Sequence, residues 1–389
     1  CLELVVPPCQ MIWPRSLVSG LQPHDFVSGF VAMEKNAMFE MQNKTVNYRV
    51  LAGTWNVGGV SPPDDLELED LLDTKANSYD IYVLGFQEIV SLNARNVLGP
   101  KKRSASIKWN SLIGDALNNR RRRQGGEAMS RCRGDEAGLH QEQGMFRCVM
   151  SKQMVGIFVS VWARSALRRH VRHAAVSCVG AGVLGRFGNK GAVSIRFLLH
   201  DTSFCFVCCH LASGGEHGDA MLRNADAASV LSRTSFHGHA GHGAAPPPKK
   251  ILDHDRVVLL GDLNYRIAMD AGEARQLVTA KKWGMLLEND ELLLELCKGR
   301  QFDGWREGVV TFPPTYKYHR DSDQFYWCVD DDAGSGDKQH RAPAWCDRVL
   351  WRGKGMKQIR YERCGGYRLS DHRPVRAVFH AVCEVLEGR

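Results

Sequence analysis

Four strand-like segments follow one another almost without interruption in the middle of the chain, and they constrain the fold more than any other feature. They occupy residues 154–163, 170–180, 190–200 and 202–211, and each has a majority of apolar residues. The links between them are too short to hold a crossover helix, which parallel neighbours require. We therefore expect antiparallel pairing and exclude a doubly wound parallel sheet.

The rest of the chain adds more strands and a few helices. Many strands with few helices indicate an α+β protein in which two packed sheets are covered by helices. Further strands are expected at 47–57, 80–90, 256–263, 345–352 and 373–382, and helices at 64–78, 218–233 and 272–298, the last broken near Gly284.

The first 45 residues differ from the remainder of the chain. Residues 1–45 show no clear periodicity and are expected to form an N-terminal extension that is partly disordered, ahead of a folded domain at 46–389. Two segments, 119–143 and 234–250, are rich in Gly and polar residues and are expected to be mobile surface insertions. The first holds the run Arg120–Arg123, which is either a solvated patch or an attraction for an anionic surface.

Charge and cysteine content limit the partner and the compartment. The net charge is +8 and the pI is near 8.8, which favours a polyanionic partner: nucleic acid, anionic lipid or a phosphorylated small molecule. The 13 cysteines lack the dense, regular spacing of a disulfide scaffold. They indicate reduced thiols in the cytosol or the nucleus.

Six strand-like segments adjoin polar residues that could bind a metal ion or a phosphate. Each one alone is explained by an ordinary turn, an exposed charge or a buried histidine. Six in one chain indicate a shared site. The polar residues are Asn56, Glu88, the pair Asn189 and Lys190, His210, the pair Asp262 and Asn264, and the pair Asp371 and His372.

The chemistry of these residues suits hydrolysis of a phosphate ester. Asn56 and Glu88 offer the hard oxygen ligands that Mg²⁺ prefers while it retains several waters. Asp262 could take a proton from an attacking water, and Asn264 could hold that water or a phosphoryl oxygen. The bare spacing CxxxxxR occurs at Cys9, Cys346 and Cys383, but none of these cysteines is interpreted as part of a phosphate-cradling loop, which disfavours a cysteinyl-phosphate intermediate.

Two histidines and one further carboxylate complete this set. His210 and His372 could donate hydrogen bonds to the charge that develops on phosphorus, and Asp347 could orient His372 through its second ring nitrogen. Together the residues predict metal-assisted phosphoryl transfer to water.

These motifs resemble those of the inositol polyphosphate 5-phosphatases, within the endonuclease/exonuclease/phosphatase superfamily, and most closely the plant branch. The matching blocks appear in family order over residues 47–380. The resemblance implies a DNase I-like fold: a four-layer α/β/β/α sandwich of two mixed, largely antiparallel sheets. The blocks are GTWNVGG, GFQEIV, GNKGAV, HLASG, GDLNYRI, PPTYKY, RAPAWCDRVLW and SDHRPV.

The resemblance also implies a role for each matching residue. It places Mg²⁺ on Glu88 with help from Asn56, and Asp371 beside the metal. It implies that Asp262 activates the water. The remaining catalytic assignments are Asn264 as the partner that positions this water, His210 and His372 as contacts to the scissile phosphate, and Asp347 as the support of His372.

Substrate contacts follow from the same resemblance. Tyr316, Lys317 and Arg341 resemble the clamp on the neighbouring 4-phosphate, and Lys190 the contact to the 1-phosphate. Asn189 and Arg266, in the same motifs, are assigned to the substrate as well. The family usually has a lysine two residues before this arginine, where the present chain has Gln339, with Lys338 one step earlier.

The resulting prediction is Mg²⁺-dependent hydrolysis of a 5-phosphate by an activated water. Expected substrates are phosphatidylinositol 4,5-bisphosphate, phosphatidylinositol 3,4,5-trisphosphate, soluble inositol 1,4,5-trisphosphate, or several of these. A DNA-repair-type endonuclease of the same superfamily is the alternative, although no nucleic-acid partner is expected. A non-catalytic lipid-binding module would require the loss of a site residue, and none is missing. We expect a cytoplasmic enzyme in transient, peripheral contact with membranes, aided by basic segments such as 101–103.

Overall fold

Two six-stranded sheets form the framework of the protein in its computed structural model. The structure describes residues 44–91, 103–128, 145–181, 189–215, 218–237, 246–326 and 342–385. The expected N-terminal extension and most of both expected insertions lie outside these residues. No helix in the described part has the length and apolarity needed to cross a bilayer.

Each sheet contains one parallel pair of strands, and its other pairs are antiparallel. In the first sheet β1 and β2 are parallel, and in the second β7 and β8 are parallel. The first sheet has the order β11 (Met356–Arg363), β12 (Val375–Val385), β1 (Lys44–Asn56), β2 (Ile81–Gln87), β4 (Ile157–Arg164), β3 (Phe146–Met154). The second has the order β5 (Val171–Gly180), β6 (Gly191–Leu199), β7 (Thr202–His210), β8 (Arg256–Asp262), β10 (Asp347–Arg352), β9 (Arg306–Glu307).

Three apolar layers hold the two sheets and the outer helices together. Successive side chains of a strand point to opposite faces, so Val83 of β2 joins the layer between the sheets while Leu84 joins the layer outside the first sheet. Val258 and Leu259 of β8 divide in the same way between the inner layer and the layer outside the second sheet. The central strands β2, β7 and β8 are apolar along most of their length because both of their faces are buried.

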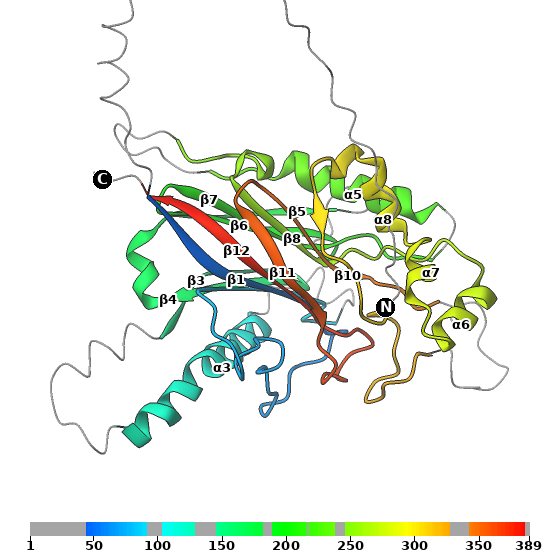
Figure 1. Cartoon of the computed structure of the whole chain (residues 1–389), viewed down its shortest axis with the longest axis horizontal. Helices are drawn as coiled ribbons and strands as arrows, with labels where there is room; N and C mark the ends of the chain where they lie inside the picture. The colour runs from blue at the N-terminus through cyan, green and yellow to red at the C-terminus, as the bar shows by residue number, and fades with distance from the viewer. Residues whose placement is uncertain are drawn as a thin grey trace, which may run out of the picture. The chain divides into compact units, whose positions relative to one another are not determined.

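Helices cover the outer faces of both sheets (Figure 1). Helix α3 (Ser104–Ala128) packs Trp109 and Ile113 against the first sheet. Helices α5 (Asp219–Arg233) and α8 (Glu291–Lys298) pack against the second through Val230 and Leu292. The expected four-layer DNase I-like sandwich is therefore confirmed.

Short links did produce antiparallel pairing, with one exception. The strands β5, β6 and β7 form a continuous antiparallel meander, as expected. The strand β4, however, pairs with β2 and β3 in the other sheet. A six-residue 3₁₀ segment, Ser165–His170, carries the chain from one sheet to the other. The short link between β4 and β5 therefore does not place these two strands in the same sheet.

Two of the expected helical segments differ in detail from the structure. Residues 64–78 form turns rather than a regular helix, and Leu68, Leu71 and Leu72 are buried against the first sheet. The segment 272–298 forms three helices rather than two: α6 (Ala271–Thr279), α7 (Trp283–Leu287) and α8. The side chain of Asp290 starts the last of these by accepting a hydrogen bond from Leu293 N (2.9 Å).

Other differences concern the strands and the first insertion. Helix α3 continues to Ala128, so residues 119–128 are helical and not loop as expected. The strands β3, β9 and β11 were not expected from the sequence. All three lie at sheet edges, where polar side chains interrupt the apolar pattern.

Candidate active site

The expected site residues lie at strand ends, and strand register brings them together. In the second sheet, His210 of β7 and Asp347 of β10 both lie opposite Asp262 of β8. In the first sheet, the parallel strands β1 and β2 end side by side at Asn56 and just before Glu88. A hydrogen bond from Asn56 Nδ2 to Asp262 Oδ2 (2.8 Å) joins the two sheets at this end.

The Asp262 carboxylate is the centre of this cluster. It is buried, and its Oδ2 lies 3.3 Å from His210 Nε2 and 3.9 Å from His372 Nε2. Its Oδ1 accepts a hydrogen bond from the backbone N–H of Asn264 (3.1 Å). Burial alone would raise the pKa of Asp262, but His372 and His210 lower it well below its ordinary value. The residue is therefore a carboxylate at neutral pH.

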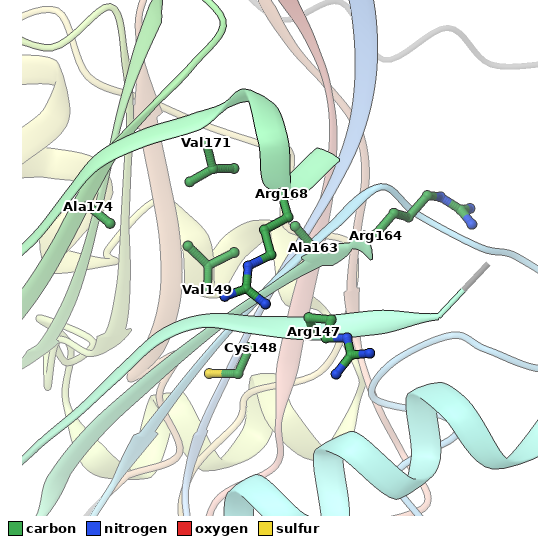
Figure 2. Close-up of a pocket in the computed structure, with 8 residues that line it drawn as sticks. All are labelled: Arg147, Cys148, Val149, Ala163, Arg164, Arg168, Val171 and Ala174. Atoms are coloured by element: carbon green, nitrogen blue, oxygen red, sulfur yellow. The ribbon is translucent and has the colours of Figure 1, made fainter. Parts of the chain in front are cut away.

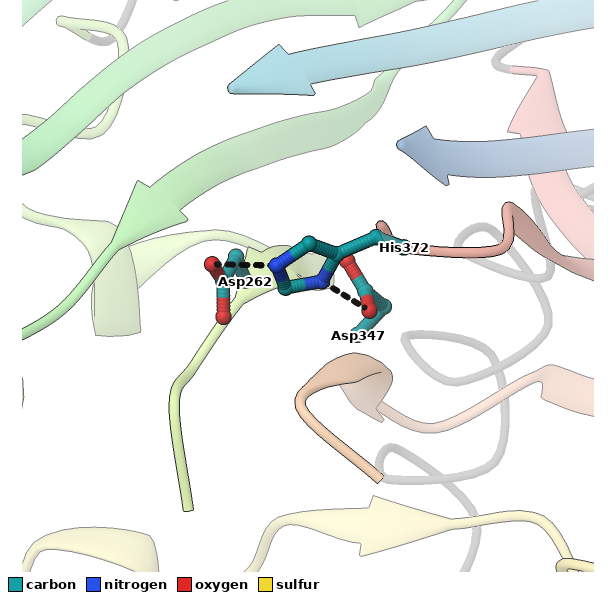
Figure 3. Close-up of side chains that lie close together, drawn as sticks. All are labelled: Asp262, Asp347 and His372. Carbon is teal, nitrogen blue, oxygen red and sulfur yellow. Dashed lines mark hydrogen bonds and ion pairs between the residues drawn. The ribbon is translucent and has the colours of Figure 1, made fainter. Parts of the chain in front are cut away.

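His372 lies between two carboxylates (Figure 3). Its Nδ1 is 2.8 Å from Asp347 Oδ2, the same oxygen that accepts a hydrogen bond from Thr315 Oγ1 (2.7 Å). Its Nε2 points to Asp262. Burial alone would lower the pKa of His372, but the charges of Asp347 and Asp262 raise it to about 9. The imidazole therefore carries protons on both nitrogens at neutral pH.

Glu88 provides a partly exposed carboxylate beside this buried group. Its backbone has a positive φ of 55°, a conformation that is uncommon outside glycine and is found at functional sites. Its Oε1 lies 3.3 Å from Asn56 Nδ2 and 3.8 Å from His210 Nε2. Its side chain is 28% exposed. The carboxylate therefore retains oxygen lone pairs for a further ligand.

The donor atoms at this end suit a hard divalent cation. Among the described residues, Asp262, Asp347 and His372 form a group whose potential ligand atoms all lie within 4.8 Å of one another. The Asp347–His372 hydrogen bond already occupies part of that group. The Glu88 carboxylate is a second potential ligand that is more open to solvent. Asn56 beside it is buried, with its Nδ2 turned to Glu88 and its Oδ1 to Gly58 N.

Asp371 lies near the Asn56 end of the site. Gly58 N–H donates to Asn56 Oδ1 (2.9 Å), and a Cβ placed on Gly58 would lie 3.3 Å from Asp371 Oδ1. The same Asp371 oxygen accepts a hydrogen bond from Ser370 Oγ (3.3 Å). The structure thus brings Asp371 close to the segment that follows β1.

Lys190 is held against His210 at the start of β6. Its Nζ lies 2.5 Å from His210 Nε2. Burial lowers the pKa of Lys190, although the charges of Asp262 and Glu88 counteract this. Burial and Lys190 also lower the pKa of His210, so this imidazole is neutral. Asn189, the preceding residue, is half-buried.

Arg266 has protein partners on most of its guanidinium group. It donates to Asn264 Oδ1 (2.8 Å), to Gly214 O (3.1 Å) and to Cys346 Sγ (3.1 Å). Its guanidinium also lies over the ring of Tyr316, 4.6 Å from the centroid. Arg266 therefore fixes the amide of Asn264, and its assignment to the substrate stays a prediction.

The expected clamp is only partly within the described residues. The ring of Tyr316 lies 4.5 Å from that of His372, and the Nζ of Lys317 lies 4.4 Å from the centre of the Tyr326 ring. Both expected clamp residues are thus on the segment in which Tyr316 pairs with His372. Arg341 lies outside the described residues, as do Lys338 and Gln339.

Comparison with known proteins agrees with the fold and identifies the family. The Endonuclease/Exonuclease/phosphatase family 2 pattern matches residues 53–378. The type IV inositol polyphosphate 5-phosphatase 9 of Arabidopsis thaliana is 51% identical over 354 residues, covering 90% of this chain and 82% of the relative. The chain belongs to the inositol polyphosphate 5-phosphatases. It is therefore a hydrolase of phosphate monoesters.

Two further relatives support the assignment of this 5-phosphatase. The type I inositol polyphosphate 5-phosphatase 8 of Arabidopsis thaliana is 45% identical, over 86% of this chain and 71% of the relative. The solved 5-phosphatase domain of SPsynaptojanin, in complex with inositol (1,4)-bisphosphate and a calcium ion, superimposes with a TM-score of 0.72. The match is at 27% identity and covers 94% of this chain and 93% of that domain.

The sequence did not predict the two hydroxyl groups, of Thr315 and Ser370, that support the site residues of the 5-phosphatase. Thr315 donates to Asp347 Oδ2, and Ser370 Oγ accepts a hydrogen bond from His372 N (3.2 Å). Both hydroxyls lie inside matching motifs, which was the available signal. Their partners, however, became evident only from the folded structure, because Thr315 and Asp347 are 32 residues apart.

Proposed function

We propose that this enzyme hydrolyses the 5-phosphate of phosphoinositides, soluble inositol 1,4,5-trisphosphate, or both, by direct attack of water in the presence of Mg²⁺. The proposal rests above all on the pairing of an ionised Asp262 with a protonated His372 at one buried strand end. These groups provide a proton acceptor and a proton-bearing cation within one site. That combination suits attack by water on a phosphate monoester.

Asp262 and Asn264 act on the attacking water. The ionised carboxylate of Asp262 accepts its proton, as a general base. The Asn264 side chain, held by Arg266 and by its own hydrogen bond to Leu211 O (3.1 Å), fixes the position of the water or of a phosphoryl oxygen. A rigid amide at this point reduces the entropy cost of aligning the reactants.

His372, His210 and Lys190 act on the phosphoryl group. His372 donates its Nε2 proton to a phosphoryl oxygen, and Asp347 holds the opposite nitrogen in place. Lys190 contributes positive charge beside His210. Donors fixed in a buried site stabilise developing charge more strongly than water does, because they need no reorganisation.

Glu88 and Asn56 are the residues that would hold Mg²⁺, with Asp371 nearby. A bound Mg²⁺ supplies positive charge that polarises the phosphoryl oxygens. The fit rests on the open carboxylate of Glu88 and on the carboxylate of Asp262, to both of which Asn56 Nδ2 donates hydrogen bonds. The calcium ion in the SPsynaptojanin complex supports the use of a divalent cation in this family.

Lys317 and Tyr316 are proposed to contact the phosphate next to the scissile one. Their segment pairs with His372, so a ring phosphate beside the reacting phosphate falls within reach of Lys317. The inositol (1,4)-bisphosphate in the SPsynaptojanin structure supports an inositol phosphate as the ligand. A lysine ammonium binds phosphate as a compact point charge.

Peripheral docking of a cytoplasmic enzyme on membranes is part of the proposal. Helix α5 begins shortly after the segment Leu211–Gly215, which contacts Asn264 and Arg266. Its first turn exposes Met221 (74%) and Leu222 (55%). Exposed apolar side chains beside a site for a lipid headgroup, on a chain of net charge +8, favour transient contact with an anionic bilayer.

Phosphate release from a substrate panel tests this function. The panel contains phosphatidylinositol 4,5-bisphosphate, phosphatidylinositol 3,4,5-trisphosphate, soluble inositol 1,4,5-trisphosphate and abasic DNA, each with Mg²⁺ or with EDTA. We expect Mg²⁺-dependent release from inositol substrates, none from DNA, and a loss of at least a hundredfold in Asp262→Asn. Turnover that persists in EDTA, or a normal rate in Asp262→Asn, would overturn the proposal.

A further inference from the structure

A second polar pocket lies at the end of the second sheet opposite to the active site. It has a volume of about 440 Å³, and we call it the basic pocket after its cationic residues Arg256, Arg306, Arg352 and Lys354. Arg256 begins β8, whereas Asp262 ends it. At a rise of ~3.3 Å per residue, the two residues are roughly 20 Å apart. The basic pocket is therefore separate from the catalytic centre.

The charge of the basic pocket is not neutralised by protein carboxylates. Among the described residues, none of its four cations lies within ion-pair distance of an Asp or Glu side chain. The one acidic residue in the lining, Asp255, accepts hydrogen bonds from Ser203 N (2.8 Å) and Ser203 Oγ (2.6 Å). Uncompensated cations in a concave site attract anions.

Arg256 is the most buried and most firmly held cation of this pocket. Its side chain is 8% exposed, and its two terminal nitrogens donate to the carbonyl oxygens of Asp255 (3.1 Å) and Val382 (2.9 Å). Its Nε is buried and has no partner among the described residues. A buried donor without a partner is unfavourable, and this one belongs to a residue that lines the pocket. Gly355 leaves room for this guanidinium, because a Cβ there would lie 2.7 Å from Nη2.

The other cations of the pocket use few of their N–H donors in hydrogen bonds within the protein. Arg352 makes one long hydrogen bond, to Asp303 O (3.3 Å), and the guanidinium of Arg306 lies over the ring of Trp351 at 5.2 Å. Lys354 is exposed on the turn after β10. Arginine presents a planar fork of N–H groups that matches two phosphate oxygens.

The depression in Figure 2 lacks these properties, although it too contains three arginines. It lies between β3, β4 and β5 and is smaller, at about 220 Å³. Arg164 is committed to Asp80 by a 2.9 Å ion pair, and Figure 2 shows its side chain directed away from Arg168. Much of the remaining lining is aliphatic. The basic pocket is therefore the better anion site.

We propose that the basic pocket binds a small anion with two or more phosphate groups, at a site distinct from the catalytic one. The ligand is a phosphorylated polyol or a diphosphate, either free in solution or carried as a lipid headgroup. The volume is in the range of small-molecule sites and accommodates a ring with several phosphates. Four unneutralised cations match a ligand of several negative charges.

Calorimetric titration of the full chain with inorganic pyrophosphate in Mg²⁺-free buffer tests the site. The variant Arg306→Ala/Lys354→Ala removes two exposed cations. We expect two binding sites in the wild type, at least tenfold weaker binding at one of them in this variant, and loss of the other in Lys317→Met. Lys357→Ala, an exposed lysine outside the pocket, is the matched control. Lys354→Glu alone repeats the test with a single exposed change.

Two further measurements distinguish a lipid headgroup from a soluble anion and test whether the pocket takes part in catalysis. The first is flotation with vesicles that contain phosphatidylinositol 4,5-bisphosphate. If Arg306→Ala/Lys354→Ala weakens vesicle binding and the control Lys357→Ala does not, the ligand is a lipid headgroup. If the pocket variant weakens pyrophosphate binding but leaves vesicle binding unchanged, the ligand is a soluble anion. Phosphate release from soluble inositol 1,4,5-trisphosphate should remain normal in the variant. Unchanged pyrophosphate and vesicle binding, or a single wild-type site abolished by Lys317→Met, would overturn the proposal.

Discussion

The hydrogen bond between His372 and Asp347 shows how a single contact prepares a residue for its role. Asp347 is fully buried, and its Oδ2 is shared between His372 Nδ1 and Thr315 Oγ1. The carboxylate therefore fixes the orientation of the imidazole as well as its charge. The opposite ring nitrogen, Nε2, faces Asp262, so the same contact also fixes where this nitrogen lies in the site.

Replacement of Asp347 by asparagine tests this support. Without the negative charge, His372 loses its strongest acceptor, and we expect kcat to fall by about 10²–10⁴-fold while KM changes only a few-fold. Thr315→Val, which removes the second hydrogen bond to the same oxygen, should reduce kcat by a smaller factor. Steady-state kinetics measure both effects, and a thermal unfolding curve identifies variants that fail to fold. A normal kcat in Asp347→Asn would refute the assignment.

The close approach of strands β7 and β8 determines where Asp262 lies. Gly261 has a φ of +149°, and a Cβ on it would lie 2.0 Å from the carbonyl oxygen of Cys209 on β7. In the facing sheet, a Cβ on Gly85 of β2 would lie 2.8 Å from Cys208 Sγ on β7. Small residues at these positions let the sheets and strands meet, so the strand before Asp262 is constrained on two sides.

Gly261→Ala is expected to damage both stability and activity. The added methyl group clashes with backbone, which cannot move like a flexible side chain, and the strained φ adds a cost of about 1–3 kcal/mol. Denaturant unfolding should show the loss, and kcat should fall because Asp262 shifts. Gly284→Ala, on an exposed position of α7 with open space around it, is the control and should be neutral or slightly stabilising. Equal behaviour of the two variants would contradict this account.

At the scale of the whole molecule, ion pairs tie the crossover between β1 and β2 to the strands β11 and β12. Asp73 accepts hydrogen bonds from Tyr79 Oη (2.5 Å) and Arg360 (2.6 Å), and lies 3.8 Å from Arg376. Burial would raise the pKa of Asp73, but Tyr79 and the two arginines lower it below its ordinary value of 3.8. The crossover is thereby fixed beside the first sheet without forming a helix.

The pH dependence of stability follows from the direction of this shift. Because the folded-state pKa of Asp73 is lowered, its carboxylate stabilises the fold above pH 3.8, and this contribution is lost as the pH falls through the folded-state value. We expect Asp73→Asn to cost about 2 kcal/mol at pH 7 and progressively less toward pH 3. Urea unfolding at several pH values measures this. The exposed Asp65→Asn is the control, and a cost that does not depend on pH would contradict the linkage.

The proposed membrane docking is also argued at the scale of the whole molecule, because it combines net charge with an exposed apolar turn. Met221→Ser/Leu222→Ser should reduce hydrolysis of vesicle-bound substrate about tenfold, since two partly inserted side chains lose their burial, and should leave soluble substrate unaffected. Ile359→Ser, on the edge strand β11, is the matched control. Raising the salt concentration should weaken vesicle binding of the wild type. Equal losses on both substrates would exclude a docking role.

The sequence by itself predicted most of the strands and nearly all of the residues that gather at the site. Its apolar runs indicated buried strands, and the polar residues at their ends, such as Asp262 and His372, were recognisable from motifs. These features depend on residues that are close in sequence, so a local pattern is sufficient to predict them. The clamp residue Arg341 and the expected extension at 1–45 stay predictions, because they lie almost wholly outside the described residues.

Only the tertiary structure decided how distant segments meet. It placed β4 and β5 in different sheets, packed residues 64–78 as turns, and gave Arg266 the task of holding Asn264. It also placed four cations around one pocket at the far end of the sheet. Sequence patterns report which face of a segment is apolar, whereas the partners of a buried polar group depend on strand register and sheet packing. Those are set by the free energy of the whole fold and not by any one segment.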